Sequence, residues 1–469
     1  GYGPCPNPPY VRVRKVHTMK NPRRAFDKKL QSASTADRPT VLINARLIDP
    51  ATGRDEPGGL FLQDGKIADL GSHLRRNAPD GATVIDCAGN VVCPGLIDMH
   101  VFTGEPGAEH RETLRTASQA AAAGGVTTII CMPNTDPVID DVALVDYIER
   151  RARDRALVHV RTMAALTKGL KGQEMTEIGL LQRAGAVAFT NGKASIASAR
   201  VMRNALAYSR DFDALVVHYA EDATLAEAGV MNEGEAASHM GLPGIPTAAE
   251  TLVLERDLRL VGITGARYHA PLVSCAESLE VVRAAKARKL AVTCGVSVNH
   301  LTLCDGDVAP WRSFFKLRPP LRGESDRAAM ISGIASGAID VIVSSHDPQG
   351  ADVKRQPFAD AIDGAIGLET LLSAALRLYH SKQVGLLPLL KALTSNPADI
   401  LGLPAGRLEK NAPADVIQVD LDAHWLVDKD KILSRAKNTP FDEVALQGRV
   451  QRTFVAGRCV YSQGEILDA

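Results

Sequence analysis

The sequence has few aromatic residues, no excess of charge and no long apolar run. Aromatic side chains make up 4% of the 469 residues, and the formal net charge is zero because 54 basic residues balance 54 acidic ones. A chain without excess charge has no general attraction to nucleic acid or to an acidic membrane surface. No apolar run approaches the roughly 18 residues of a membrane-spanning helix, and no secretory signal is visible. These absences predict a globular protein that binds neither nucleic acid nor membrane.

The eight cysteines are scattered along the chain, and none of them forms a CxxC pair. Paired spacings are typical of disulfide frameworks and of zinc sites, so their absence disfavours both. Free cysteine is among the residues most often buried. We therefore predict reduced, mostly buried thiols in a cytoplasmic protein.

Residues 1–38 differ in composition from the rest of the chain. Gly1–Pro9 is rich in proline, and Val11–Leu30 is crowded with Arg and Lys and lacks apolar periodicity. This composition predicts a flexible extension. A basic arm that docks on a partner is the alternative interpretation.

Beyond Cys87, short apolar runs that predict strands alternate with stretches that predict helices. Eight buried strands with helices between them are typical of an α/β protein, specifically a (β/α)8 TIM-type barrel. An open, doubly wound sheet is the alternative, but no glycine-rich phosphate-binding motif follows the first strand. The predicted strands are 91–100, 126–134, 156–166, 186–191, 214–221, 267–274, 290–296 and 339–346.

The segments on both sides of this pattern read as short alternating strands. Residues 40–49 and 59–70 are of this kind, and so are 414–419 and 451–461. We expect the two ends of the chain to form one small β-sandwich domain. The predicted organisation is an extension at 1–38, the first sandwich part at 39–92, the barrel with trailing helices at 93–406 and the second sandwich part at 407–469.

The first predicted barrel strand ends in His100, with Phe102 two residues later. In a strand, residues i and i+2 point to the same side. A second histidine at position 102 would form a two-imidazole metal grip with His100, but phenylalanine cannot bind a metal. Other strands end in Asn134, Asn191, His218 and the run 345–347, whereas His269 lies inside its strand. A lone histidine is weak evidence for a site, but a barrel brings its strand ends together.

Several phrases of the sequence resemble the amidohydrolase superfamily, and most closely the dihydroorotases. The resemblance extends from about Pro39 to the C-terminus and implies a barrel with a small β-sandwich. In this family zinc lowers the pKa of a bound water to about 7, so that hydroxide attacks a cyclic amide. The matching phrases are 94–100 (PGLIDMH), 105–107 (EPG), 123–128 (AGGVTT), 132–135 (MPNT), 185–189 (GAVAF), 218–221 (HYAE), 318–322 (RPPLR) and 396–398 (NPA).

The resemblance implies metal ligands at six positions, of which His100 and His218 remain. The second residue of the first histidine pair is Phe102, and the strand 4 ligand is the neutral Asn191. Leu272 occupies the position of the strand 6 histidine. On strand 8, Ser345 occupies the position of the aspartate that in the family also shuttles the proton.

The substrate side is altered as well. Gly104 occupies the position at which the family has an arginine that binds the substrate carboxylate. Arg318 occupies the position of a family asparagine before the Pro-Pro-Leu-Arg phrase. Asn134, Arg318 and His346 remain as predicted substrate-pocket residues. A zinc site normally needs three or more protein ligands. The combined changes therefore predict a preserved barrel whose metal site and catalysis are lost, with no cofactor.

Three residues could rebuild a site. Asp347 lies two residues after Ser345, so it could act as a shifted ligand or base. Lys193 is close to the end of strand 4, where a modified lysine can bridge metals in relatives. His269 precedes Leu272 by three residues, so in a regular strand it points elsewhere. The alternative is therefore a zinc-dependent cyclic amidohydrolase with a mononuclear site that uses His100, His218 and Asp347. In a purely structural interpretation, Asp347-Pro348 caps the turn after strand 8.

The resemblance also implies a role for a member without catalysis. Such chains are similar to the non-catalytic dihydroorotase-like subunits that assemble with aspartate carbamoyltransferase. We expect a structural or regulatory partner of that enzyme in pyrimidine biosynthesis, as a homodimer or hetero-oligomer. A ligand-binding sensor that uses the old pocket is a third hypothesis.

Overall fold

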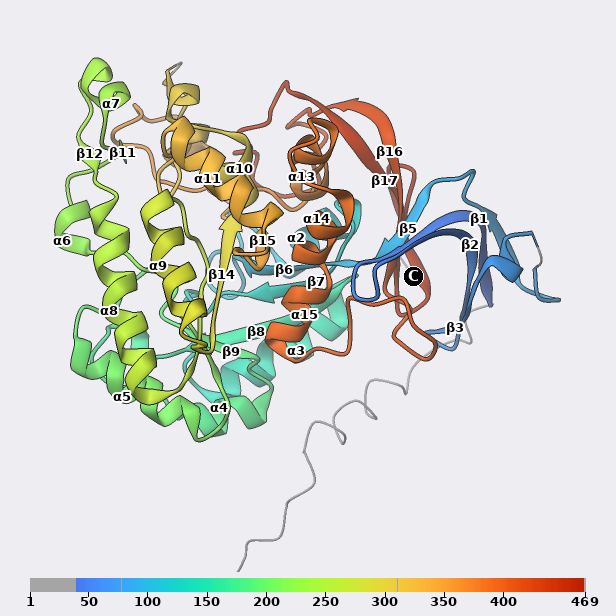
Figure 1. The fold of residues 1–469 in the computed structure, drawn as a ribbon, viewed down its shortest axis with the longest axis horizontal. Coiled ribbons are helices and arrows are strands. Elements are labelled where there is room, and N and C mark those ends of the chain that lie inside the picture. The colour runs from blue at the N-terminus through green and yellow to red at the C-terminus, as the bar shows by residue number, and fades with distance from the viewer. Residues whose placement is uncertain (1–38, 77, 310, 468–469) are drawn as a thin grey trace, which may run out of the picture. The chain divides into compact units, whose positions relative to one another are not determined.

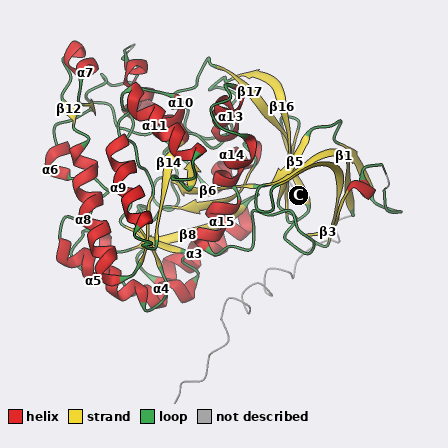
Figure 2. Ribbon diagram, in the orientation of Figure 1, coloured by secondary structure: helices red, strands yellow, loops and turns green. Residues whose placement is uncertain are grey.

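The computed structural model describes residues 39–76, 78–309 and 311–467. The predicted extension at 1–38 lies outside these residues. Within them, an eight-stranded parallel sheet is wrapped by helices and adjoins a nine-stranded sheet (Figures 1 and 2). The predicted fold class is confirmed.

The parallel sheet follows the order of the chain from one edge to the other. Its edge strands meet where Val101 bridges to His346, and the backbone N–H of Phe102 donates to the His346 carbonyl at 2.9 Å. The sheet is therefore a nearly closed barrel. Its strands are β6 (Leu96–Val101), β7 (Val126–Cys131), β8 (His159–Ala165), β9 (Ala188–Thr190), β10 (Leu215–Val217), β13 (Arg267–Ala270), β14 (Val292–Ser297) and β15 (Val341–Val343).

Helices follow most of the barrel strands and cover the outside of the barrel (Figure 1). Their buried faces carry Ala, Val, Leu and Ile, which form one large apolar cluster with the outer faces of the strands. The longer helices are α2 (Leu114–Ala123), α3 (Val142–Arg155), α4 (Ile178–Ala184), α5 (Ala199–Arg210), α8 (Ala248–Thr264), α9 (Ala276–Ala287), α11 (Glu324–Ala335), α13 (Leu371–His380), α14 (Leu386–Leu393) and α15 (Ser395–Leu401).

The second sheet is built from both ends of the described chain. Strand β5 pairs with β1 on one side and with β16 on the other, so the two ends share one continuous sheet. Its strands are β1 (Thr40–Asp49), β2 (Arg54–Gln63), β3 (Lys66–Gly71), β4 (Thr83–Asp86), β5 (Val91–Pro94), β16 (Val416–Leu426), β17 (Ala445–Val455), β18 (Arg458–Ser462) and β19 (Glu465–Ile466). A separate apolar cluster supports this sheet.

The predicted strand 91–100 is two strands that belong to different sheets. The chain leaves β5 and enters β6 at Gly95, whose N–H donates to the Asp415 carbonyl. A Cβ at Gly95 would lie 2.1 Å from the hydroxyl oxygen of Thr127, so only glycine fits there. The run was predicted as one strand because the sequence is apolar on both sides of Gly95.

An excursion between β10 and β13 was also not predicted. It contains α6 (Ala223–Ala226), β11 (Met231–Asn232), α7 (Glu235–Met240) and β12 (Gly244–Ile245). The buried guanidinium of Arg322 holds it, by donating to the Asn232 side chain at 3.0 Å and to the Ile245 carbonyl at 3.1 Å. The arginine of the Pro-Pro-Leu-Arg phrase therefore has a structural role. The remaining short elements are α10 (Val298–Thr302), α12 (Ala351–Lys354) and the 3-10 turns η1 (Ser72–Leu74), η2 (Lys168–Leu170), η3 (Asp305–Val308) and η4 (Ser313–Phe315).

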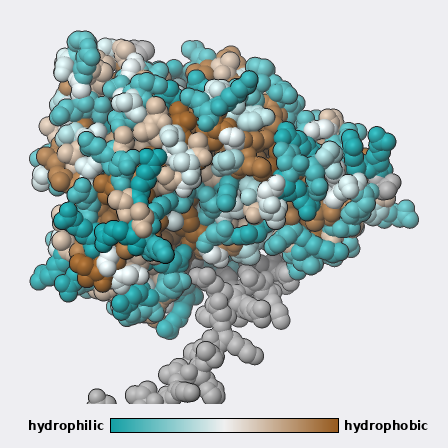
Figure 3. Space-filling view, viewed as in Figure 1, coloured by the Kyte–Doolittle hydropathy of each residue, from teal (hydrophilic) through white to brown (hydrophobic). Residues whose placement is uncertain are grey.

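The surface and the thiols agree with the composition. The face in Figure 3 mixes hydrophilic and apolar side chains. No helix within the described part of the chain combines the length and apolarity needed to cross a bilayer. The seven described cysteines are free, and five of them are buried, as predicted. The eighth, Cys5, lies outside the described residues.

Candidate functional site

The C-terminal ends of the barrel strands surround a small polar cavity. It encloses ≈ 270 Å³, including space open to solvent, and Lys193, Arg318 and Asp347 are its charged lining residues. Ser297, Asn299, His300 and Ser345 add polar atoms. In barrel enzymes this end of the strands carries the active site. We refer to the cavity and the strand ends around it as the barrel mouth.

Strand β6 delivers His100 to the barrel mouth, above the buried carboxylate of Asp98. The Asp98 carboxylate accepts the backbone N–H of His100 at 3.1 Å, and burial raises its pKa to about 6. The His100 imidazole is also buried, and its Nδ1 has no hydrogen-bond partner. Burial and the nearby Lys193 ammonium lower the pKa of His100 to about 4. His100 is therefore a neutral imidazole with one nitrogen free to accept.

Phe102 lies two residues beyond His100 and is 4% exposed. Its ring faces the guanidinium of Arg111, whose central carbon lies 4.3 Å from the ring centroid. A cation over an aromatic face is attracted by the ring quadrupole. The position at which the family has a second imidazole is therefore occupied by a ring that holds a cationic side chain.

Asn191 at the end of β9 is turned toward the loop after β8. Its Oδ1 accepts from the Thr167 hydroxyl at 2.6 Å, and its Nδ2 donates to the Leu170 carbonyl at 3.0 Å. Both ends of the amide are therefore satisfied by the protein. Asn191 fixes a loop and offers no free donor atom to a metal.

His218 at the end of β10 has both ring nitrogens engaged. Nε2 accepts the backbone N–H of Ile196 at 2.8 Å, so the ring proton is on Nδ1, which lies 2.6 Å from the Asp257 carboxylate. A carboxylate behind an imidazole is the arrangement that orients histidine metal ligands. Here the nitrogen that would face a metal is already occupied by backbone, so His218 remains as a residue but not as an available ligand.

His269 lies on strand β13, and Leu272 lies two residues beyond the end of this strand. Leu272 packs in the apolar cluster that fills the barrel interior, together with Met99, Met163 and Val343. His269 contacts the Thr293 hydroxyl through Nδ1 at 2.8 Å, and its buried Nε2 has no partner. Burial lowers the pKa of His269 to about 3, and His100 contributes to this shift. The two partnerless imidazole nitrogens belong to neighbouring side chains.

The turn after β15 carries Ser345 and Asp347. Ser345 adopts a positive φ of 52°, and Asp347 is 5% exposed. The Asp347 carboxylate accepts from Arg111 at 2.9 Å on Oδ1, and from Lys193 at 2.5 Å and Gln349 at 3.1 Å on Oδ2. A base must accept a proton from the substrate, but two cations and an amide occupy both oxygens here. In this arrangement the Asp347 carboxylate forms ion pairs with Arg111 and Lys193.

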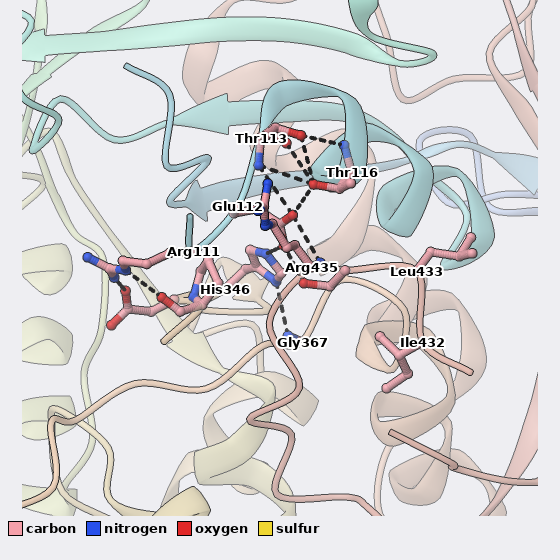
Figure 4. Close-up of polar contacts among 12 residues, drawn as sticks. Arg111, Glu112, Thr113, Thr116, His346, Gly367, Ile432, Leu433 and Arg435 are labelled. Carbon is pink, nitrogen blue, oxygen red and sulfur yellow. Dashed lines mark hydrogen bonds and ion pairs between the residues drawn. The ribbon is translucent and has the colours of Figure 1, made fainter. Parts of the chain in front are cut away.

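The predicted pocket residue His346 faces away from the barrel mouth. Its Nδ1 accepts the Gly367 N–H at 3.2 Å, and its Nε2 lies 3.4 Å from the buried Glu112 carboxylate (Figure 4). The reversal of the backbone at Ser345 turns the ring to this side. His346 lines a second cavity of ≈ 180 Å³, whose other lining residues include Glu369 and Ser434.

Arg111 and Glu112 are neighbours that hold different segments (Figure 4). Arg111 donates to the Pro348 carbonyl at 2.7 Å and to Asp347, whereas Glu112 accepts from the Ser434 hydroxyl and from the Arg435 N–H at 3.2 Å. Burial opposes ionisation of Glu112, but His346 and the hydroxyls of Ser434 and Thr116 lower its pKa. The loop after β6 therefore holds two segments against the barrel, the turn after β15 and the segment 432–435.

The two altered substrate positions also have structural partners. Arg318 forms a bidentate pair with Glu221, at 2.8 to 3.0 Å. Gly104 has a φ of 70°, and a Cβ there would lie 2.3 Å from the Glu112 carbonyl oxygen, so no arginine fits at this position without a change of backbone. Asn134 packs against Gly192, and its buried Oδ1 has no partner.

The side chains at the barrel mouth do not fit a zinc site. His100 and His269 each offer one free buried nitrogen, but Phe102 and Leu272 offer none, and the donor atoms of Asn191 and His218 are in use. No group of three or more His, Cys, Asp or Glu side chains in residues 39–76, 78–309 and 311–467 could hold a metal ion. A zinc site normally has at least three protein ligands. No reaction step through a metal is derived from this arrangement.

Several residues that organise the barrel mouth were not singled out from the sequence. Arg111 and Glu112 contact Asp347 and His346, which follow β15. Asp363 contacts Lys193, and Asp257 supports His218. They lie on loops and helices far along the chain from their partners, where the sequence carries no periodic signal. The only available signal was that Arg111 and Glu112 follow the first strand end closely.

A parallel barrel with polar strand ends and an attached, mostly antiparallel sheet has the fold of the amidohydrolases. The L-hydantoinase (dihydropyrimidinase) of Arthrobacter aurescens has this fold, with a TM-score of 0.84, coverage of 92% of this chain and 98% of its own, and 24% identity. A likeness at that identity shows the fold alone.

Sequence similarity defines the family more narrowly, and the chain belongs to the dihydroorotase family. A family model described as Dihydro-orotase-like matches residues 89–278. The dihydroorotase of Ehrlichia chaffeensis is 41% identical over 441 residues, which are 93% of this chain and 98% of that protein. The dihydroorotase of Geotalea daltonii is 41% identical over 418 residues, which are 89% and 98% of the two chains.

Proposed function

We propose that this dihydroorotase-family chain has lost metal-dependent catalysis and serves pyrimidine biosynthesis as a structural or regulatory partner of aspartate carbamoyltransferase. One observation carries the proposal. Apart from the free nitrogen of His100, the atoms that would hold zinc are missing, as at Phe102, or already bonded within the protein, as at His218. Loss of a general base alone costs roughly 10²–10⁴ in rate. The free thiols of the described cysteines support a cytoplasmic location.

The second candidate is an active dihydroorotase with an unusual mononuclear zinc site. The names of the relatives favour it, because chains called dihydroorotase are 40–42% identical over almost their whole length. Such a site would have to use the free nitrogens of His100 and His269. Asp347 would have to release Lys193 or Arg111 before it could bind a metal or a proton.

Metal content and turnover separate the two candidates. The proposal expects much less than one zinc per chain after purification without chelators, and no hydrolysis of dihydroorotate above the buffer rate with added zinc. Near-stoichiometric zinc, with turnover abolished by His100→Ala, would overturn the proposal. Lys168→Ala is a suitable control, because that side chain forms an exposed ion pair with Glu174 and does not line the cavity at the barrel mouth.

The partnership has a test of its own. The full-length chain is co-expressed with the aspartate carbamoyltransferase of the same organism and passed through gel filtration. We expect one complex and a loss of carbamoyltransferase stability when this chain is omitted. Separate elution, with a carbamoyltransferase that is stable and fully active alone, would remove the partner role even if the chain proves inactive.

A further inference from the structure

Lys193 connects three loops at the barrel mouth. It follows β9, and its ammonium donates to Asp347 at 2.5 Å and to Asp363 at 3.1 Å. Asp347 belongs to the turn after β15, and Asp363 belongs to the segment before α13. The Asp347 side chain is 7% exposed and the Asp363 side chain 26%, so neither carboxylate is freely solvated. One positive charge therefore draws together two carboxylates from separate segments.

A second cation completes the pairing of Asp347. Arg111 donates to its other oxygen at 2.9 Å, and the same guanidinium lies over the ring of Phe102. Phe102 occupies a former ligand position, and Asp347 lies two residues beyond another, Ser345. Two altered strand ends, β6 and β15, are thus joined through Arg111 and Asp347, and Lys193 joins the end of β9 to them.

We propose that Lys193 is a built-in cation that does for the barrel mouth what a bound metal ion would do, by holding the surrounding loops together through their carboxylates. This inference rests on the proposed loss of the metal site. It adds that the site was replaced by an internal charge network and was not simply emptied. The same ammonium disfavours a divalent cation beside it, because like charges at close range repel strongly in a partly buried site.

An ordinary loop ion pair would give the same distances, so the test must report on the need for a charge. Lys193→Ala removes the ammonium and leaves Asp347 and Asp363 facing vacated space. Lys193→Arg keeps a positive charge. Lys168→Ala removes another lysine from an ion pair at a strand-end loop and serves as the matched control.

Thermal unfolding of the full chain is measured with EDTA, with Mg²⁺, Mn²⁺ or Zn²⁺, and with methylammonium. The wild-type Tm is expected to be the same in all conditions. Lys193→Ala is expected to lower the Tm by about 1–2 °C in EDTA, and added divalent cation or methylammonium should restore at least half of that loss. Lys193→Arg and Lys168→Ala should stay within about 0.5 °C of the wild type.

Two results would overturn the inference: a Tm of Lys193→Ala equal to that of the wild type, or a lowered Tm that no cation restores. If Lys193→Ala does not fold, Lys193→Gln replaces it, because it preserves length and a hydrogen-bond donor without the charge. A Lys193→Gln protein without a cation response would equally overturn the inference. A metal-free, inactive wild type combined with either result leaves the proposed function standing, whereas zinc-dependent turnover of the wild type removes the proposed function itself.

Discussion

The two sides of the barrel mouth contrast in what surrounds the former ligand positions. On the side of β10 and β13, His218 is held by Asp257, which also accepts from the Tyr268 hydroxyl at 3.0 Å. On the side of β6 and β15, Phe102, Arg111 and Asp347 form a network of cations, a ring and a carboxylate. The first side retains a support that suits a ligand histidine, whereas the second retains only His100 among its ligand positions.

The difference shows which parts of a metal site are also parts of the fold. Asp257 is fully buried and has three partners, so its loss would leave polar groups unpaired inside the protein. The Phe102 side chain has no polar atom, so its removal leaves no buried hydrogen-bonding group unpaired. The carboxylate behind His218 is therefore part of the fold, whereas the ring at position 102 contributes packing and a contact with a cation.

The largest expected effect is on the β10 side. Asp257→Ala leaves His218, Tyr268 and Arg256 without their shared acceptor, and we expect a loss of about 3–5 kcal/mol in unfolding free energy. Urea unfolding measures it. Asp399→Ala, which removes an exposed partner of Arg407, should cost less than about 1 kcal/mol. An equal loss of unfolding free energy in the two variants would mean that Asp257 supports the fold no more than an exposed carboxylate does.

On the β6 and β15 side the same kind of change should cost less. Asp347→Asn leaves Lys193 and Arg111 partly exposed, so water compensates in part, and we expect a loss of about 1–2 kcal/mol. In a double-mutant cycle with Lys193→Met, the two losses should be non-additive by at least about 0.5 kcal/mol. Strict additivity would mean that the two side chains do not support each other.

A pH dependence should come from Glu369, near the Glu112 loop. Burial raises its pKa from 4.5 to about 7, against the N–H groups of Leu433 and Ser434, which favour ionisation. The folded state thus binds this proton more tightly than the unfolded state. Its contribution to stability is complete below pH 4.5 and is lost as the pH rises to about 7.

Glu369→Gln removes that titration. The stability difference between wild type and variant should therefore change by about 1 kcal/mol between pH 5 and pH 7, with the wild type losing more. Chemical unfolding at a series of pH values measures the difference. A difference that is constant across this range would contradict the raised pKa.

The smallest effect is expected at Phe102. Phe102→Leu keeps an apolar side chain but removes the aromatic face below Arg111, which should cost about 0.5–1 kcal/mol. Phe102→His should not create zinc binding, because Nε2 of His218 still accepts the Ile196 N–H. Zinc binding by Phe102→His in equilibrium dialysis would mean that the β10 side can still act as a ligand.

The sequence predicted the barrel because its strands are apolar runs at regular spacing, and seven of the eight runs overlap a barrel strand alone. The run at 91–100 merged β5 and β6, since nothing in an apolar run shows that the chain changes sheets at Gly95. The two-residue strands β11 and β12 are too short to have a period. Element ends differ by a few residues, as expected for boundaries.

The barrel-mouth residues were predictable only where a strand end or a family phrase marked them. His100, Asn191 and Asp347 were found in that way. The partners that decide their state were not found, because Arg111–Asp347 and Lys193–Asp363 join residues far apart in the chain. The sequence identified Phe102 as a residue that cannot bind a metal, and the structure adds that a guanidinium lies over its ring.

Gly104 has a consequence for any attempt to place the family's arginine at this position. Its backbone is held at a positive φ directly against the Glu112 carbonyl, so a new side chain meets an obstacle before it can reach a substrate. A Gly104→Arg substitution alone would therefore not bring a guanidinium to the barrel mouth. The backbone of the loop from 103 to 112 would have to change together with the side chain.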